Sequence, residues 1–202
     1  MKFAFVTCVQ IGLSCIEEIY NIGNSLELII TLDDKNSPDK SGRVFLDDFC
    51  KEKNIEILKI RSINEDICKE KILAHKVDWL FIIGWSQIAK PEILKIPLKG
   101  VIGAHPTLLP SGRGRASIPW AILKSLKYTG VTFFKMDESV DTGAIIDQQI
   151  IPIDKDEDAS SLYKKVVLTH KQLIKKIMKN LLKSKITLKK QNNLNSSYWP
   201  RR

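Results

Sequence analysis

Short apolar runs alternate with segments of helical periodicity along this chain, and the alternation constrains the fold more than any other feature. The run WLFIIG from Trp79 has no polar alternation, which is typical of a strand covered on both faces. The pattern predicts an α/β fold, a Rossmann-like and mainly parallel twisted sheet flanked by helices, with sites at the carboxyl ends of strands. Predicted strands cover 3–8, 26–32, 55–60 and runs from 79, 100, 130 and 144; predicted helices cover 13–20, 65–75, 118–126 and a segment from Ser41.

The length of 202 residues predicts a single domain, 1–202, that ends in an amphipathic helix over 158–183. No apolar stretch approaches the roughly 20 residues of a membrane helix, and the start lacks a cleavable leader, so we expect a cytoplasmic protein without a membrane partner. The four cysteines form no CxxC pair and do not cluster with histidines. We therefore expect buried, reduced thiols and no metal site.

The net charge of +9 comes from one part of the chain. Residues 1–150 carry 19 basic and 19 acidic side chains, whereas residues 151–202 carry 13 basic and 4 acidic ones. The lysines alternate with apolar residues at helical spacing, as on the solvated face of an amphipathic helix. Apart from Tyr163, aromatic residues that could stack on bases are absent there until Tyr198 and Trp199, so nucleic acid is not an expected partner. The aromatic pair either packs on the sheet or mediates a homodimer.

His105 and Asp141 are the leading candidates for acid–base chemistry. A histidine titrates near neutrality, and a carboxylate can set its protonation state. His105 follows the predicted strand at Val101, where the topology places sites. Arg113 and Arg115 flank Gly114 in the next loop and either present two guanidinium groups to an anion or are solvated.

Several common motifs are absent from the sequence. The segment after the first strand, VQIGLSC, has one glycine and matches neither GxGxxG nor a P-loop, and no GxSxG elbow occurs. Dehydrogenases, nucleoside triphosphatases and serine hydrolases of these types are therefore not favoured.

The stretch HPTLLPSGRGRASIPWAILKSLKYTGVTFFKMDESVDTGAII resembles the signature of formyltransferases that use 10-formyltetrahydrofolate. The resemblance covers residues 1 to about 190. The RGRA and PW motifs, with GWSQIAKPEIL from Gly84, are most similar to the branch that N-formylates nucleotide-linked amino sugars. Glycinamide ribonucleotide formyltransferases match the length but usually lack RGRAxIPW. Methionyl-tRNA formyltransferases carry an added tRNA-binding domain, for which we expect too few residues here.

The resemblance implies roles for the acid–base pair. The acceptor amine would attack the formyl carbon of the folate, His105 would stabilise the oxyanion, and Asp141 would hold the imidazolium and accept the amine proton. Where the family usually has asparagine two residues before the histidine, this chain has Gly103. That departure leaves open a binding protein for folate or a nucleotide sugar with impaired turnover.

The resemblance also implies the folate-binding residues. They form a turn after His105, a loop before Asp141 and a segment after the apolar strand at Trp79. No residue selects the acceptor, and Lys2, Arg43 or the C-terminal lysines either meet a diphosphate or are solvated. The expected folate set is Gly84, Trp85, Gln87, Ile88, Thr107, Leu108, Leu109, Pro110, Arg115, Asp137, Glu138, Ser139 and Val140.

Overall fold

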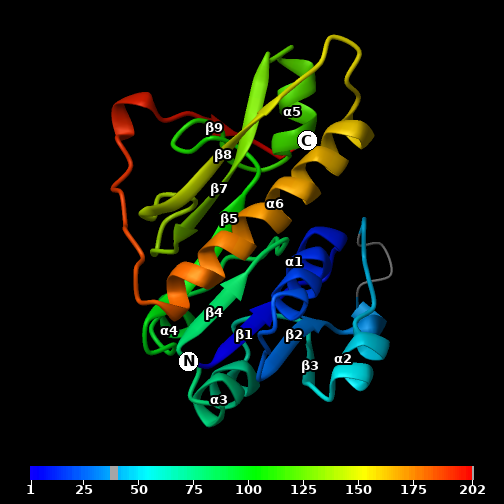
Figure 1. Ribbon diagram of the computed structural model, residues 1–202, viewed down its shortest axis with the longest axis vertical. Helices are drawn as coiled ribbons and strands as arrows, with labels where there is room; N and C mark the ends of the chain where they lie inside the picture. The colour runs from blue at the N-terminus through cyan, green and yellow to red at the C-terminus, as the bar shows by residue number, and fades with distance from the viewer. Residues whose placement is uncertain (37–40, 202) are drawn as a thin grey trace. The chain divides into compact units, whose positions relative to one another are not determined.

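The computed structural model describes residues 1–36 and 41–201 of the chain (Figure 1). Arg202, the last residue of the C-terminal YWPRR sequence, lies outside the described residues. The chain divides into a first unit, Met1–Gly103, and a second unit, Ala104–Arg202. Strands that pair in parallel, flanked by helices, confirm the predicted mainly parallel α/β fold.

The first unit contains the parallel part of the sheet, in the order β3-β2-β1-β4-β5. Every residue of β1 and β4 is buried, which explains why their sequences are apolar without alternation. β5 begins in the first unit and ends in the second, at His105. The strands are β1 Phe3–Val6, β2 Leu28–Leu32, β3 Glu56–Ile60, β4 Trp79–Ile82 and β5 Gly100–His105, and the helices are α1 Gln10–Asn21, the 3-10 turn η1 Asp34–Asn36, α2 Asp47–Lys53, α3 Asp66–Ala74 and α4 Pro91–Leu94.

The helix predicted from Ser41 begins later than the sequence indicates. α2 starts at Asp47, and Leu46 is its N-cap residue, so the serine does not cap it. The residues before α2 pair with the chain that follows β1: Val44 N–H donates to the Cys8 carbonyl at 3.0 Å, and Arg43 bridges to Val9. These main-chain bonds hold the segment extended.

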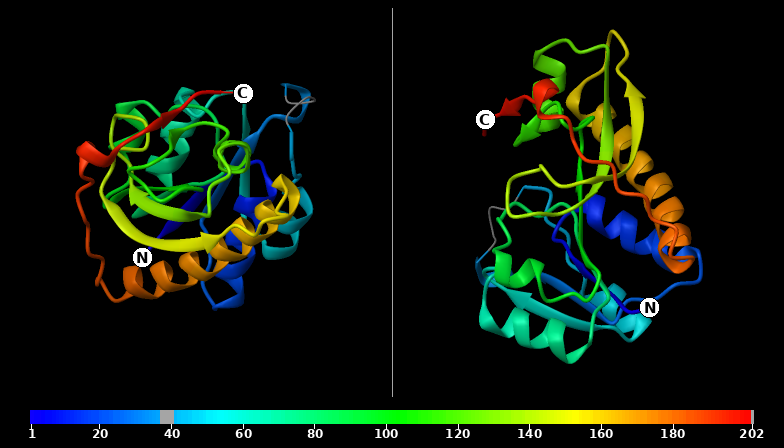
Figure 2. Two further views of the ribbon diagram at one scale, coloured as in Figure 1. Left: turned by 90° about the horizontal axis from the view of Figure 1, so that it is seen from above. Right: turned by 90° about the vertical axis from the view of Figure 1, so that its left-hand side faces the viewer.

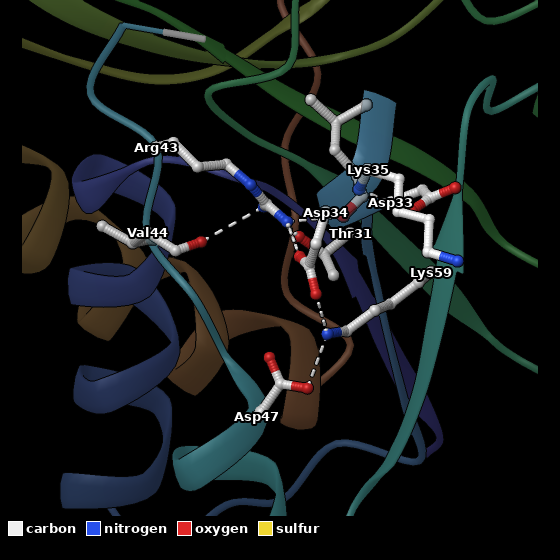
Figure 3. Close-up of polar contacts among 9 residues, drawn as sticks. Thr31, Asp33, Asp34, Lys35, Arg43, Val44, Asp47 and Lys59 are labelled. Carbon is white, nitrogen blue, oxygen red and sulfur yellow. Dashed lines mark hydrogen bonds and ion pairs between the residues drawn. The ribbon is translucent and has the colours of Figure 1, made fainter. Parts of the chain in front are cut away.

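Arg43 organises this segment (Figure 3). Its guanidinium donates to Thr31 Oγ1, to the carbonyls of Leu32 and Val44, and to the Asp34 carboxylate. Its side chain is only 8% exposed. The guanidinium bonds are therefore made within the first unit, which removes the basis for expecting Arg43 to meet a diphosphate.

Lysine contacts complete the Arg43 cluster. Lys59 pairs with Asp34, and also with Asp47 at 2.6 Å. Its hydrogen bond to Asp34, reinforced by Arg43, holds the pKa of that carboxyl below its usual range. Two cations thus face two carboxylates, and the cluster joins β2, β3 and the start of α2.

The second unit is built on an antiparallel hairpin of β7 and β8, with α6 along it (Figure 2). α6 agrees with the helix predicted over 158–183: Asp158 is its N-cap, and Asp158 and Ser161 form a capping box. Apolar residues of α6 at helical spacing are buried. The elements are β6 Arg113–Gly114, α5 Ser117–Leu123, β7 Tyr128–Lys135, β8 Ile145–Pro152, α6 Ala159–Leu182, the 3-10 turn η2 Asn193–Asn195 and β9 Tyr198–Trp199.

The chain after α6 returns alongside the second unit, as Figure 2 shows. Lys189 and Ile145 form an antiparallel bridge, and β9 pairs in parallel with β6. Trp199 is buried, and a Cβ atom added at Gly112 would lie 2.8 Å from its ring. Trp199 therefore packs inside the unit, while Tyr198 is exposed. We call residues 189–199 the C-terminal strap.

Candidate active site

His105 is the last residue of β5 and is almost completely buried. Its Nε2 lies 2.8 Å from the Gly112 carbonyl, which can only accept, so Nε2 carries a hydrogen. Its Nδ1 lies 3.5 Å from Asp141 Oδ2. The structure thus brings the two predicted catalytic residues together, with Nε2 engaged by main chain and Nδ1 facing the carboxylate.

Asp141 lies in the loop between β7 and β8, in an uncommon backbone conformation. Its φ angle is 55°, in the left-handed region that residues with a Cβ rarely adopt. Its Oδ2 accepts a 2.9 Å hydrogen bond from the Gly114 N–H, and its carbonyl accepts from Gln191. Both the carboxylate and the main chain of this residue are therefore fixed by partners distant in sequence.

The two arginines that flank Gly114 have different environments. Arg113 is buried, and its guanidinium donates to the side-chain oxygens of Gln191 and Asn193. Arg115 is exposed, and its main-chain N–H donates to the Trp199 carbonyl. The expectation that both guanidinium groups face one anion is wrong for Arg113, because its bonds are made to the C-terminal strap.

The turn predicted to contact folate, Thr107 to Pro110, is held by Thr132 on β7. The Thr132 hydroxyl donates to the Thr107 carbonyl at 2.7 Å and accepts from the Leu109 N–H at 3.1 Å. Leu109 is buried, Leu108 half-buried, and the Leu109–Pro110 peptide bond is cis. Thr107 Oγ1 is buried and has no hydrogen-bond partner within the described residues.

The loop before Asp141 is exposed and closed by a local turn. Asp137 Oδ1 accepts from the Thr142 hydroxyl at 2.6 Å and from the Ser139 N–H at 3.2 Å. Glu138 and Val140 are exposed in the same loop. These residues therefore lie next to Asp141, as the sequence predicts, on the surface of the second unit.

The remaining folate candidates lie in the first unit, after β4. Gln87 donates to the Arg61 carbonyl at 2.7 Å and accepts from the Ile63 N–H, so its amide holds the loop after β3. Ile88 is 63% exposed, which does not fit the closing of an apolar pocket. Gly84 has a φ angle of 68°, and Trp85 Nε1 is buried with no partner in the described part of the chain.

His75 and His170 have partners other than His105 and Asp141. His75 is an ion-pair partner of Glu56 in the first unit. His170 is fully buried on α6, where its Nδ1 donates to the Val166 carbonyl at 2.8 Å. Desolvation lowers its pKa to about 4, so it is neutral at pH 7. All four cysteines are buried, as predicted.

A sequence model described as formyl transferase matches residues 36–178 of the chain. The chain belongs to this family. The curated methionyl-tRNA formyltransferase of Lachnospira eligens is 26% identical over 98% of the chain and 64% of its own length. The chain spans about half to two thirds of the length of the curated relatives it matches.

Solved formyltransferases have the same fold. A sugar 3N-formyl transferase, determined in the presence of dTDP and 5-N-formyl-THF, is 25% identical with a TM-score of 0.77 and covers all of this chain and 70% of its own. The phosphoribosylglycinamide formyltransferase of Bacillus halodurans is 21% identical with a TM-score of 0.77, covering 96% of this chain and 98% of its own. The family's fold is therefore shared by proteins named for different acceptors.

Sequence reasoning missed the C-terminal strap. Three side chains of the strap contact the loop that carries Arg113. Arg113 donates to Gln191 and Asn193, and Ser197 Oγ accepts from the Gly112 N–H at 2.9 Å. Their partners lie 78 to 85 residues earlier in the chain. Periodicity detects neighbours on one element, so nothing in the QNN run could indicate these contacts.

No helix among residues 1–36 and 41–201 is long and apolar enough to cross a membrane. The same residues contain no group of three or more His, Cys, Asp or Glu side chains placed to hold a metal ion.

Proposed function

We propose that the protein is an N-formyltransferase, which moves a formyl group from 10-formyltetrahydrofolate to the primary amine of an acceptor. The observation that supports this most directly is the contact between His105 Nδ1 and Asp141 Oδ2 at the end of β5. A buried imidazole beside a carboxylate can supply a hydrogen bond and accept a proton in one step. Membership of the formyl transferase family supports formyl transfer as the reaction that this pair catalyses.

His105 acts through Nδ1 in this proposal. Nε2 already donates to the Gly112 carbonyl, so Nδ1 is the nitrogen left to face a substrate. At 3.5 Å from Asp141 Oδ2, the Nδ1 contact is longer than a strong charge-assisted hydrogen bond. In the imidazolium form Nδ1 also carries a hydrogen, which it can share with a formyl oxygen placed beside it as negative charge develops there.

Asp141 accepts the proton in this proposal. The acceptor nitrogen forms a bond to the formyl carbon, the bond from that carbon to the folate nitrogen breaks, and the amine proton passes to Asp141 directly or through water. The folate nitrogen takes up that proton from Asp141, directly or through water, as it leaves, and Asp141 returns to its carboxylate form. Gly114 N–H holds Oδ2 in place, so the carboxylate does not have to reorganise during transfer.

The described residues fit a folate. Thr107 Oγ1 in the second unit and, separately, Trp85 Nε1 in the first unit are buried hydrogen-bonding groups that have no partner within residues 1–36 and 41–201, and each belongs to the predicted folate set. Buried polar groups are normally satisfied, so each fits a polar group of a ligand. Leu109 packs with Phe134 and Ile145 in a buried apolar cluster, which supports the turn that carries Thr107.

Gly103 supplies no side-chain amide to this site. The oxyanion would rest on His105 Nδ1–H, on main-chain N–H groups and on water. We propose that turnover persists without the asparagine, because His105 and Asp141 are both present, with Nδ1 3.5 Å from Oδ2.

For the acceptor, we propose a nucleotide-linked amino sugar. The RGRA and Pro-Trp motifs support this choice, and so does the similarity to a sugar 3N-formyl transferase. Methionyl-tRNA is the second candidate, because the curated relatives carry that name. Glycinamide ribonucleotide is the third, and its support is a shared fold alone.

An acceptor panel tests the proposal. The purified protein is incubated with 10-formyltetrahydrofolate and one amine at a time: nucleotide-linked amino sugars, methionyl-tRNA and glycinamide ribonucleotide. We expect folate-dependent formylation of an amino sugar and at least tenfold less with the others. Turnover with methionyl-tRNA alone would show that the acceptor is methionyl-tRNA and not an amino sugar. Folate binding without turnover of any amine would show that the protein binds folate and does not transfer formyl groups.

A further inference from the structure

We propose that Gln191 is a positioning residue that holds the turn carrying Asp141 for catalysis. The inference rests on the proposed formyl transfer, because it concerns the placement of the group that accepts the amine proton. Gln191 lies on the C-terminal strap, 50 residues after Asp141, and is only 6% exposed. It does not contact the reacting atoms in this proposal and acts through Asp141.

The amide of Gln191 holds the Asp141 turn on both sides. Its Nε2 donates to the Asp141 carbonyl at 2.9 Å and to the Gly143 carbonyl at 2.8 Å. These two bonds use both hydrogens of the amide nitrogen. One side chain therefore fixes the main chain at Asp141 and two residues beyond it.

The turn needs a partner because its backbone is uncommon. A residue with a Cβ at a φ of 55°, as at Asp141, costs of order 1 kcal/mol or more. Gly143 packs so closely that a Cβ there would lie 1.9 Å from the Lys135 carbonyl oxygen. A conformation of this kind persists only where surrounding contacts determine it, and the Gln191 bonds are such contacts.

Arg113 fixes Gln191 from the other side. Gln191 Oε1 accepts from Arg113 Nε at 3.2 Å and from Arg113 Nη2 at 2.7 Å. A cation on the amide oxygen polarises the amide and strengthens the two bonds that its nitrogen donates. Gly114, the next residue, donates to the Asp141 carboxylate. The main chain and the carboxylate of Asp141 are thus held by one connected network.

The chemistry of this position requires glutamine. Glutamate would keep the acceptor for Arg113 but would set a carboxylate oxygen against the carbonyls of Asp141 and Gly143. Asparagine is shorter by one methylene and could not reach both partners. Gln191→Glu therefore removes the two donated bonds while the Arg113 contact and the side-chain volume are kept.

The kinetic test compares Gln191→Glu with Gln149→Glu, a matched change in β8 where the glutamine amide donates to Gln172 on the surface. We expect Gln191→Glu to lower kcat about 30-fold with KM for folate within about threefold, as loss of a group that orients a reacting residue does. Gln149→Glu should keep wild-type kcat. In an Asp141→Asn background, Gln191→Glu should lower residual kcat less than threefold, because both changes act through one group.

A second measurement does not depend on activity. Hydrogen exchange of the Gly114 amide reports its bond to Asp141 Oδ2 in the ligand-free protein. We expect exchange at least tenfold faster in Gln191→Glu and unchanged in Gln149→Glu. Unchanged exchange, or an equal loss of kcat in both backgrounds, would overturn the inference. If wild type transfers no formyl group, the proposed function fails, while the exchange result still decides whether Gln191 holds Asp141.

Discussion

The side chains of Arg43 in the first unit and Arg113 in the second are both largely covered, but their partners differ in charge. Arg43 meets the Asp34 carboxylate, and Lys59 joins the same cluster with Asp47 (Figure 3). Arg113 instead donates to the neutral side-chain amides of Gln191 and Asn193. The network around Arg43 consists of ion pairs between its own members. The network around Arg113 continues through the Gln191 amide, which donates to the Asp141 carbonyl.

The difference separates two uses of a buried cation. The charge of Arg43 is neutralised by the Asp34 carboxylate beside it. Arg43 therefore serves as a structural link between β2 and the segment before α2. Neutral partners leave the Arg113 charge able to polarise the groups that position the acid–base pair. We infer that the polar network of the first unit supports its fold and that the network of the second unit supports chemistry.

The largest effect should come from the acid–base pair of the second unit. His105→Ala and Asp141→Asn should each lower kcat for formyl transfer by at least about 100-fold, because general acid–base groups contribute that much or more. His75→Ala, which alters an ion pair of the first unit, should leave kcat unchanged. Steady-state assays check this, and either site variant with half of wild-type turnover would refute the assigned roles.

The pH dependence of the free energy of unfolding should reveal a contribution from His170, a buried histidine of the second unit. Its folded pKa of about 4 lies below the ordinary value of 6.5, so the unfolded chain binds more protons between these values. The free energy of unfolding should therefore fall as pH drops from about 6.5 to about 4, by about 3 kcal/mol from this group. Urea unfolding across that window should show a shallower dependence in His170→Leu. An unchanged slope in His170→Leu would contradict the prediction.

Methionine replacements of the two arginines should have different consequences. Arg43→Met should lower the free energy of unfolding by about 2 kcal/mol, since it leaves buried acceptors unpaired, and should not change kcat. Arg113→Met should have a similar cost in stability and also lower kcat about tenfold, because Gln191 loses its cation. Urea unfolding and steady-state kinetics measure both quantities. Equal kcat in the two variants would contradict the inference that only the Arg113 network supports catalysis.

The smallest effect concerns helix capping, in which α6 of the second unit differs from the other α-helices. α6 has a side-chain cap at Asp158, whereas the N-cap residues of the other α-helices in the described residues, such as Lys90, make no side-chain cap bond. Asp158→Ala should lower Tm by about 3 °C, the usual consequence of losing a cap in a domain of this size. Lys90→Ala is the control and should leave Tm within about 1 °C. Calorimetry measures both, and equal shifts would contradict the prediction.

The sequence predicted elements with a strong apolar signal and missed those defined by distant pairing. The strands at Phe3, Leu28 and Trp79 and the helix α6 were predicted from periodicity, which burial and helical spacing impose locally. α4 is one turn long, and β6 and β9 are two residues each, too short for any period. The helix predicted from Ser41 begins only at Asp47, because main-chain pairing with the chain after β1 overrides a local capping signal.

The candidate site shows the same division. The sequence by itself determined the parallel α/β fold, the family motifs and the choice of His105 and Asp141, because each depends on residue type and order along the chain. Only the tertiary structure decided which imidazole nitrogen faces Asp141 and that the partners of Arg113 are Gln191 and Asn193. These contacts join residues tens of positions apart, and their geometry is set by packing of the whole second unit, which no local pattern encodes.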